Sequence, residues 1–446
     1  MSYPAASGLC AERGTSFPPG GCFSGDPLPQ LPHSRSLVGV SHTVDDAPVP
    51  DAPFDLAARV LALVPELIDI RRDLHMHPEL GRQEFRTTGL VRARLELAGL
   101  RPRVMPGGTG LTCDIVPNGT PVGAPLMAFR ADIDALPIDD AKPGGVPYRS
   151  TVPGRTHACG HDVHIAVVLG LGLVLAEAAR EGRLKRPVRL LFQPAEEVMP
   201  GGALDMIEGG ALKGVDRIFA VHCDPKVDVG RIGLKVGAIT SACDRLVVSL
   251  DGPGGHTARP HLTTDLVTAV AKTASELPSA LGRRMDPRWG VSLVWGRIEA
   301  GSAANVIPLH AELEGTVRCL ELAGWREAPG ALEELIGQIA ETYRAKWVLD
   351  YHRGVPPVVN EAGSVAMLTD AMERGVGPDR VDGTEQSLGG EDFSWYLEHV
   401  PGALARLGVR TPGDTVSRDL HQGTFDVDED AIGVGVRLFS ALALDA

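Results

Sequence analysis

The sequence predicts an α/β fold, with a central, mostly parallel sheet flanked by helices and a smaller α+β domain inserted into it. Short apolar runs at Leu126–Phe129, Val188–Phe192 and Ile218–Val221 predict buried strands, and a long helical segment, His161–Arg180, separates the first two. Alternation of this kind is typical of a parallel sheet with crossover helices. A change of pattern near residue 238 predicts where the inserted domain begins.

The main domain is predicted to occupy residues 55–237 and 354–446. Residues 1–54 are rich in Pro, Gly and Ser and show no sustained period, so we expect a disordered leader there. From Pro65 onward, Leu67, Ile70 and Leu74 recur at helical spacing, which places the proline in the first turn of a helix. Near the end of the chain, Asp428 is expected to cap the final helix.

The inserted domain is predicted to span residues 238–353. Its pattern indicates two helices among about four strands, typical of a small α+β sandwich. The expected elements, in order, are a strand at Arg245–Leu250, a Gly-rich turn at Gly252–Gly255, a helix at Thr264–Leu277, strands at Val291–Arg297 and Ala311–Arg318, and a helix at Gly330–Arg344.

The composition narrows the classes of partner. A net charge of −14, with no stripe of Lys and Arg, argues against nucleic acid as a partner. We expect no membrane span, because no run of eighteen apolar residues occurs, and no secretory signal, because no basic segment precedes an apolar one. The 7 cysteines show no Cys-x-x-Cys spacing, which indicates a reducing compartment and favours a cytoplasmic location.

Polar side chains follow each predicted strand of the main domain. Asp132 and Asp134 come after the first run, Glu196 and Glu197 after the second, and His222 after the third. In open α/β sheets, ligands bind beyond the carboxyl ends of the strands. These side chains are therefore expected to face one crevice.

The segment His157-Ala-Cys-Gly-His-Asp-Val-His164 is the densest group of metal-capable side chains in the chain. Thiolate and imidazole both suit borderline-soft divalent ions, and a helix N-terminus favours the thiolate. The alternative is ordinary helix capping by Asp162 with histidines on a polar face. Because several metal-capable residues lie within eight positions, we favour a metal site that includes Cys159 and His161.

Glu196 and Glu197 point in different directions at a strand end, so one can bind metal while the other takes a proton from water. Alone, this pair is equally well explained as an acidic loop, and His222 and His421 are each weak signals. Together, one thiolate, imidazoles and two carboxylates at element ends favour a metal centre. Cys159 as a protease-like nucleophile is an alternative, but it leaves the glutamate pair without a role.

At these residues the sequence resembles the hippurate hydrolase, aminoacylase and indoleacetyl-amino-acid hydrolase family of dinuclear metallopeptidases. The resemblance runs from about Leu67 to Leu442. The matching segments are Asp73-Leu-His-Met-His-Pro-Glu79, Arg130-Ala-Asp-Ile-Asp-Ala-Leu-Pro137, His157-Ala-Cys-Gly-His-Asp162, Phe192-Gln-Pro-Ala-Glu-Glu197, Gly254-Gly-His-Thr-Ala-Arg-Pro-His261, Asn305-Val-Ile-Pro308, Gly315-Thr-Val-Arg318, Gly390-Glu-Asp-Phe393 and Leu420-His-Gln-Gly423.

The resemblance implies a role for each candidate residue. It implies two divalent ions, Mn or Zn first and Co or Ni next, with Cys159 as the bridging ligand and Glu196 as the general base. It makes the inserted domain a lid, through which two copies could pair as a homodimer. The remaining implied roles are metal ligands at His161, Glu197, His222 and His421, second-shell orientation by Asp132 and Asp134, oxyanion stabilisation by His256, and substrate binding by Asn305 and Arg318.

This sequence departs from its relatives in two places. Arg130-Ala-Asp132 stands where the wider superfamily has a ligand histidine in an H-x-D motif, which is usual for the cysteine-bearing subgroup. Val198-Met-Pro200 stands where relatives usually have a small, Gly-rich stretch, so a narrower pocket is expected there. For Arg318, a solvated strand end is an equally good interpretation.

The expected activity is hydrolysis of the amide bond of N-acyl amino acids, hippurate-like or N-acetylated, by metal-activated water with Glu196 as base. The expected partner is a small-molecule substrate. Two alternatives remain open: a dipeptidase or carboxypeptidase on the same scaffold, and a non-catalytic binding protein of the same fold.

Overall fold

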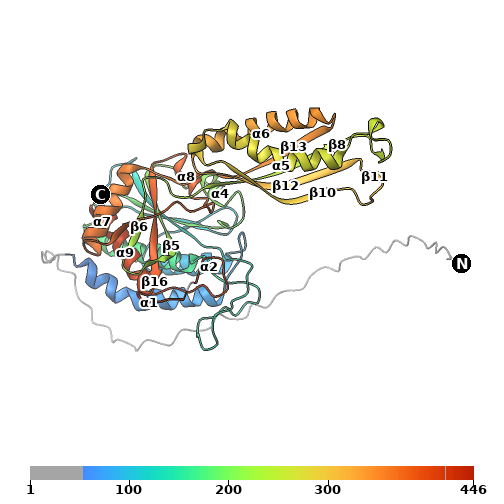
Figure 1. The fold of residues 1–446 in the computed structure, drawn as a ribbon. Helices are drawn as coiled ribbons and strands as arrows, with labels where there is room; N and C mark the ends of the chain where they lie inside the picture. Colours follow the sequence, from blue (N-terminus) through green and yellow to red (C-terminus); the bar gives the residue numbers. More distant parts are fainter. Residues whose placement is uncertain (1–53, 417, 446) are drawn as a thin grey trace, which may run out of the picture. The chain divides into compact units, whose positions relative to one another are not determined.

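The computed structural model describes residues 54–416 and 418–445, so the expected leader lies outside these ranges apart from its last residue. The main domain is built on an eight-stranded sheet in the order β1-β2-β4-β3-β5-β16-β6-β15 (Figure 1). The strands are β1 (Arg103–Val104), β2 (Leu111–Ile115), β3 (Leu126–Asp132), β4 (Val188–Gln193), β5 (Val215–Asp228), β6 (Ile232–Leu234), β15 (Val381–Gly383) and β16 (Gly402–Arg410).

The predicted α/β fold class is confirmed. The four central strands β4, β3, β5 and β16 are parallel, while β1, β2 and β6 make antiparallel pairs toward the two edges. The carboxyl ends of the central strands therefore open onto the same edge of the sheet. The expected convergence of the residues that follow these strands depends on this arrangement.

Helices flank this sheet. Helix α3 is almost wholly buried and packs against α1, α9 and the central strands. It is the single helix in the described part of the chain that is long and apolar enough to cross a membrane, but 89% of its apolar window is buried inside the protein, as in a core helix. The helices of the main domain are α1 (Leu56–Met76), α2 (Phe85–Leu97), α3 (His161–Arg180), α4 (Ala203–Glu208), α7 (Ala362–Gly375), α8 (Ser394–Leu397) and α9 (Asp430–Asp445).

A second, four-stranded antiparallel sheet lies within the inserted segment, in the order β10-β12-β8-β13. Helices α5 and α6 pack on it and on each other and enclose a separate apolar core (Figure 1). The elements of this segment are β8 (Ala242–Asp251), β9 (Gly255–His256), α5 (Leu266–Arg284), β10 (Ser292–Ala300), β11 (Val306–Ile307), β12 (His310–Cys319), α6 (Leu322–Thr342) and β13 (Lys346–Val355).

Two short strands, β7 (Gly237–Ala238) and β14 (Val359–Asn360), pair with each other where the chain leaves and re-enters the main domain.

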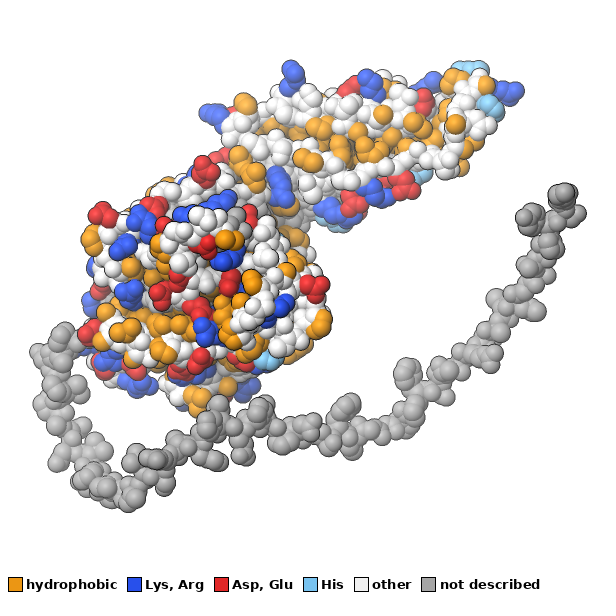
Figure 2. All heavy atoms as spheres, turned by 60° about the horizontal axis from the view of Figure 1, so that its bottom comes forward, with side chains coloured by type: hydrophobic (Ala, Val, Ile, Leu, Met, Phe, Trp, Pro, Cys, Tyr) orange, Lys and Arg blue, Asp and Glu red, His pale blue; other side chains and the backbone are white. Residues whose placement is uncertain are grey.

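Figure 2 shows acidic and basic side chains side by side over the face in view. On β10, for example, the guanidinium of Arg297 forms ion pairs with Glu299 and Glu312.

Three expected helix boundaries are wrong, each because of a proline. Helix α1 begins at Leu56, with Asp55 as its N-cap, and contains Pro65 in its interior. Helix α5 continues past Pro278, and α6 begins eight residues before the expected Gly330 with Pro329 inside it. A proline costs a helix interior about 3 kcal/mol. Each of these helices buries a row of apolar side chains on both sides of its proline, and this burial outweighs that cost.

Strand β5 is longer than the apolar run that predicted it. Its pairing with β3 ends at Ala220, whereas its pairing with β16 continues to Asp228. His222 therefore lies inside the strand rather than after it, at the point where β5 has lost its neighbour on one side. The hydrogen-bonded pairing of β3 with β5 has stopped before His222, so no residue of β3 stands beside the imidazole.

Asp244 joins the inserted sheet to the segments around it. Its buried carboxylate accepts hydrogen bonds from Trp325 Nε1 at 3.0 Å, the Tyr351 hydroxyl at 2.6 Å and the Gly354 amide at 2.8 Å. Trp325 belongs to α6, and Tyr351 and Gly354 belong to β13. One carboxylate thus satisfies three donors, of which the Tyr351 hydroxyl is part-buried and the other two are buried.

We expect Asp244→Ala to lower the stability of the inserted domain by about 3 kcal/mol, because three donors, two of them buried, lose their acceptor. Hydrogen exchange of β8 and β13 amides and the midpoint of thermal unfolding measure this loss. The control is Asp350→Ala, since Asp350 is exposed and paired only with exposed His352; its effect should stay within about 0.5 kcal/mol. Equal effects of the two changes would contradict the role of Asp244.

Candidate metal centre

The expected metal-capable residues converge beyond the central strands. Cys159 and His161 flank Gly160 at the start of α3, and Glu196 and Glu197 follow β4. Gly160 has φ +88°, and a Cβ there would lie 2.7 Å from Cys223 Sγ, so the turn that brings its two neighbours together requires glycine. The other two side chains come from β5 and from the loop before α9: His222 and His421.

Two sets of three ligand atoms share the Cys159 sulfur. One set is Cys159 with His161 and His222; the other is Cys159 with Glu197 and His421, and within each set the atoms lie within 4.8 Å of one another. The sulfur is 3.4 Å from His222 Nε2, and His421 Nε2 is 3.2 Å from Glu197 Oε1. A thiolate shared by two donor sets is the arrangement that a bridging ligand requires.

Hydrogen bonds fix which nitrogen each buried histidine presents. His161 Nδ1 lies 2.9 Å from the Asp134 carbonyl oxygen, and His222 Nδ1 lies 2.8 Å from the Cys223 carbonyl oxygen. Each ring therefore donates through Nδ1 and leaves a lone pair on Nε2. Within residues 54–416 and 418–445, neither His161 Nε2 nor Glu197 Oε1 makes a well-directed hydrogen bond, although both are buried; the nearest cationic group to Glu197 Oε1 is the His421 ring at ion-pair distance. Such atoms fit a bound cation, because buried polar groups otherwise find partners.

The two aspartates after β3 hold the candidate ligands. Asp134 accepts hydrogen bonds from the Glu196 and Glu197 amides at 3.1 and 3.0 Å. Asp132 Oδ1 lies 2.6 Å from His164 Nδ1, while His164 Nε2 accepts from the Cys223 amide at 2.9 Å. Both nitrogens of His164 are thus engaged, so this histidine braces the site without offering a free lone pair.

The site is strongly acidic. Burial first, and then the carboxylates of Glu391 and Glu197, raise the pKa of Glu196 well above its usual range. Burial, with Glu197 next, likewise raises the pKa of the Cys159 thiol. Burial lowers the pKa of His161, but Asp132 and Asp134 outweigh it and raise that pKa to about 10. The potential of the crevice therefore favours cations, and a divalent ion there stabilises the thiolate and carboxylates.

The three candidates from the inserted segment lie apart from this cluster. His256 pairs with Val306 between β9 and β11, and the Asn305 carbonyl accepts from the Thr257 amide at 3.2 Å, so these two residues are neighbours. His256 is exposed, and among the described residues no hydrogen bond or ion pair joins it to the cluster. Arg318 donates to the Leu388 carbonyl at 2.5 Å, close to the loop that carries Glu391.

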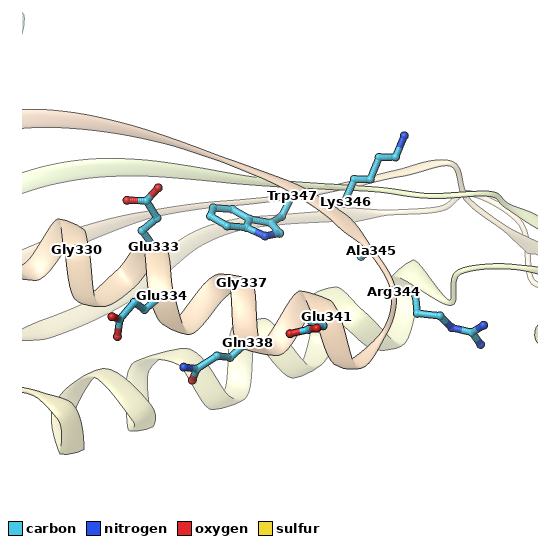
Figure 3. A pocket seen from close by; sticks show the side chains of 10 residues that line it. All are labelled: Gly330, Glu333, Glu334, Gly337, Gln338, Glu341, Arg344, Ala345, Lys346 and Trp347. Carbon is cyan, nitrogen blue, oxygen red and sulfur yellow. The ribbon is translucent and has the colours of Figure 1, made fainter.

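A groove of about 740 Å³ lies on the outer side of α6, where the Trp347 indole packs against Gly337 (Figure 3). Its charged lining includes Glu333, Glu334 and Glu341, with Arg344 at one end. It holds no cysteine or histidine. The chemistry that the donor atoms indicate is therefore placed beyond the central strands and not in this groove.

Comparison with known proteins agrees with this geometry. Residues 128–445 match the family model described as peptidase family M20/M25/M40. The chain belongs to this family. It is therefore a metal-dependent amidohydrolase of the M20 family, in which dinuclear metal binding is found.

Three known proteins illustrate the similarity. The chain is 48% identical over 377 residues to a Rhodococcus jostii (strain RHA1) protein named as glutamate–cysteine ligase 2-3; the match covers 84% of this chain but 46% of that protein, so the chain spans about half its length. It is 38% identical over 367 residues to N-acetyl-L-cysteine deacetylase of Bacillus subtilis (strain 168), with 82% and 85% of the two chains covered.

The third is a Bacillus subtilis crystal structure described as a dinuclear metal binding peptidase from the M20 family. It is 34% identical to this chain, with a TM-score of 0.74, and the alignment covers 86% of this chain and 98% of that one. At this identity the comparison supports both the fold and the family.

Sequence patterns missed Glu84. This residue precedes α2, is fully buried, and accepts a hydrogen bond from the Ala195 amide at 2.7 Å. Ala195 has φ +56°, a strained value for a residue with a Cβ, and it directly precedes Glu196. Glu84 thus holds the turn that directs the glutamate pair of the M20 centre. Burial, with Asp134 a lesser contributor, raises the pKa of Glu84 to about 7.

We expect Asp134→Ala to weaken metal binding by about 10- to 100-fold, because it frees the backbone of both glutamates. Competition with a chelator, followed for Mn²⁺ and Zn²⁺, measures the change. Asp139→Ala is the matched control, since exposed Asp139 accepts only from the Gly154 amide. Unchanged metal affinity in Asp134→Ala would show that the two amides hold their position without it.

Proposed function

We propose that this M20 enzyme hydrolyses the amide bond between an acyl group and an amino acid. The observation that carries the proposal is the pair of donor sets sharing Cys159, with the buried carboxylate of Glu196 beside them. The similarity to a protein named N-acetyl-L-cysteine deacetylase supports an N-acyl amino acid as the substrate class.

In this proposal two divalent ions would be held by Cys159, which belongs to both groups of ligand atoms, together with His161, Glu197, His222 and His421. The mixture of sulfur, nitrogen and oxygen donors suits Mn or Zn, and also Co or Ni. Ions held there would supply Lewis acidity, which lowers the pKa of a bound water and polarises a carbonyl group. The carboxylates and the thiolate supply the negative charge that holds them.

Glu196 moves the proton. Its Oε2 lies 3.9 Å from His161 Nε2, so it borders the ligand atoms without a short bond to any of them. We assign it to take a proton from the attacking water and deliver it to the leaving amine. Burial raises the pKa of this carboxyl group above its usual range, which makes its carboxylate a stronger proton acceptor than a solvated one.

The inserted domain is proposed to act as a lid. His256 would stabilise the oxyanion of the tetrahedral intermediate, and Asn305 and Arg318 would bind the substrate. Because His256 is exposed in this chain, it reaches a substrate either when the lid closes or from a second copy paired through the lid.

We also propose a cytoplasmic location. The described cysteines support it, because all of them are free thiols: Cys113, Cys159, Cys223, Cys243 and Cys319.

We expect Glu196→Ala to retain both metal ions and to lose about 10²- to 10⁴-fold in kcat, the usual contribution of a general base. Metal content is measured by elemental analysis, and turnover with N-acetylmethionine. Glu197→Ala is the companion variant, because it removes a proposed ligand and should lose metal as well as activity. Wild-type turnover in Glu196→Ala would rule out the proposed mechanism.

Substrate panels separate the proposed activity from peptidase activity on the same scaffold. The wild-type enzyme with Mn²⁺ or Zn²⁺ should hydrolyse N-acetyl or N-benzoyl amino acids with a higher kcat/KM than dipeptides, and a chelator should abolish the reaction. Amine release measured with ninhydrin gives the rates. Because a similar crystal structure is described as an M20 peptidase, the alternative is a higher kcat/KM for dipeptides. That result would mean that the enzyme prefers an aminoacyl group to an N-acetyl or N-benzoyl group on the amide nitrogen.

A further inference from the structure

A cavity of about 820 Å³ opens beside the candidate centre. Its lining includes Cys223 and Leu420, which are the chain neighbours of His222 and His421. Leu388, whose carbonyl accepts from Arg318, also lines it. The cavity is therefore lined by the chain neighbours of two candidate ligands and by the residue whose carbonyl contacts Arg318 of the inserted domain.

Arg406 lines this cavity from β16. In the parallel pairing of β16 with β5, Arg406 stands directly beside His222, so the two side chains leave the same face of the sheet. On its other side, in β6, its partner is Gly233, which adds no side chain. Arg406 thus stands next to a candidate metal ligand and also lines the cavity.

Arg406 is only 7% exposed, yet no carboxylate neutralises it. Within residues 54–416 and 418–445, it forms no hydrogen bond or ion pair, and Asp224 and Glu391 act on it only from longer range. The cavity's other two arginines are paired: Arg231 with Asp382 at 2.5 Å and Arg410 with Asp228 at 2.6 Å.

A guanidinium that is largely buried and has no counter-ion among the described residues is costly, because it has lost much of its hydration without gaining an opposite charge. Ions bound by the neighbouring cysteine and histidines would add positive charge and increase that cost. The guanidinium fork matches a carboxylate with two parallel hydrogen bonds. An anion entering the cavity would therefore find a preformed partner next to the reacting centre.

We propose that Arg406 binds a carboxylate of the substrate and sets the enzyme's preference for anionic amides. This inference rests on the proposed amidohydrolase function and names a residue that determines its specificity. The carboxylate has two possible sources, the α-carboxylate of the amino acid and a second carboxylate in its side chain or acyl group. Substrate pairs that differ in one charge distinguish these sources.

The test compares the metal-loaded wild-type enzyme with Arg406→Met, which keeps the apolar stem and removes the charge. N-acetylmethionine and its amide differ at the α-carboxylate, and N-acetylglutamate and N-acetylglutamine differ at the side chain. N-succinylmethionine and N-butyrylmethionine differ in the acyl group. In one pair, the wild-type preference for the charged member should fall about 10- to 100-fold in the variant, mainly through KM.

Arg410→Gln is the matched control, because Arg410 lines the same cavity but is already paired with Asp228. It should leave all three charge preferences unchanged. Arg406→Met should unfold at or above the wild-type temperature, since it removes an unpaired buried charge. If Arg406→Met fails to fold, Arg406→Lys takes its place; it keeps the charge, loses the fork and should show a smaller shift in the same pair.

Two results would overturn the inference. In the first, all three preferences stay as in the wild type. In the second, kcat falls equally for charged and neutral members, which would mean that Arg406 only balances the acidic cluster.

Titration of the metal-loaded protein with glutarate gives a readout without turnover: affinity should fall about tenfold or more in Arg406→Met and stay constant in Arg410→Gln. If the wild type hydrolyses none of the amides, the proposed function fails, and this titration still decides the role of Arg406.

Discussion

The centre depends on the buried guanidinium of Arg130. From the middle of β3 it donates to Gln193 at 2.8 Å, Asp132 at 2.7 Å, Glu391 at 2.9 Å and Asp392 at 2.7 Å. These groups belong to two neighbouring strands and to a loop 261 and 262 residues further along the chain. One side chain therefore draws three distant segments together and offsets part of their negative charge. Removing one partner of such a buried network is strongly destabilising, since the remaining charges stay unsolvated.

Arg130 neutralises only part of the negative charge in the crevice. The negative charge that remains is available to bind cations at the centre. Asp132 is held in its ionised form by Arg130, His161 and His164, whereas burial and Glu391 raise the pKa of Asp392 to about 8 even with Arg130 in contact. The crevice thus contains more carboxylates than fixed cations can neutralise. Divalent ions held there would complete the charge balance, which explains why His161 Nε2 and Glu197 Oε1 are buried and yet make no hydrogen bond among the described residues.

The sequence predicted the parts of this site that follow from local pattern. Parallel neighbouring strands end at the same edge of the sheet, so the polar residues that follow β3 and β4 were expected to lie close together. The metal-capable residues around Cys159 were recognisable because they are adjacent in sequence at the start of a helix. Long-range partners left no such trace. From the sequence, Glu84 looks like an ordinary polar residue before a helix, and Arg130 looks like a charged residue at the end of a strand. Their burial depends on contacts with distant segments, which the local sequence pattern does not describe. The three interior prolines misled for the same reason: tertiary packing outweighed a local preference.

The pairing of β16 with β5 has a consequence for biosynthesis. Strand β5 ends at Asp228 and β16 begins at Gly402, so the whole inserted domain leaves the ribosome before the central sheet can close. The inserted domain has its own core, and all strands of its sheet lie in one stretch of the chain, so it can fold before β16 is made. During that interval β5 is an open edge, with His222 on it and its future neighbour still unsynthesised. Such edges recruit other chains, so the newly made protein is most exposed to aggregation until β16 emerges and pairs with β5.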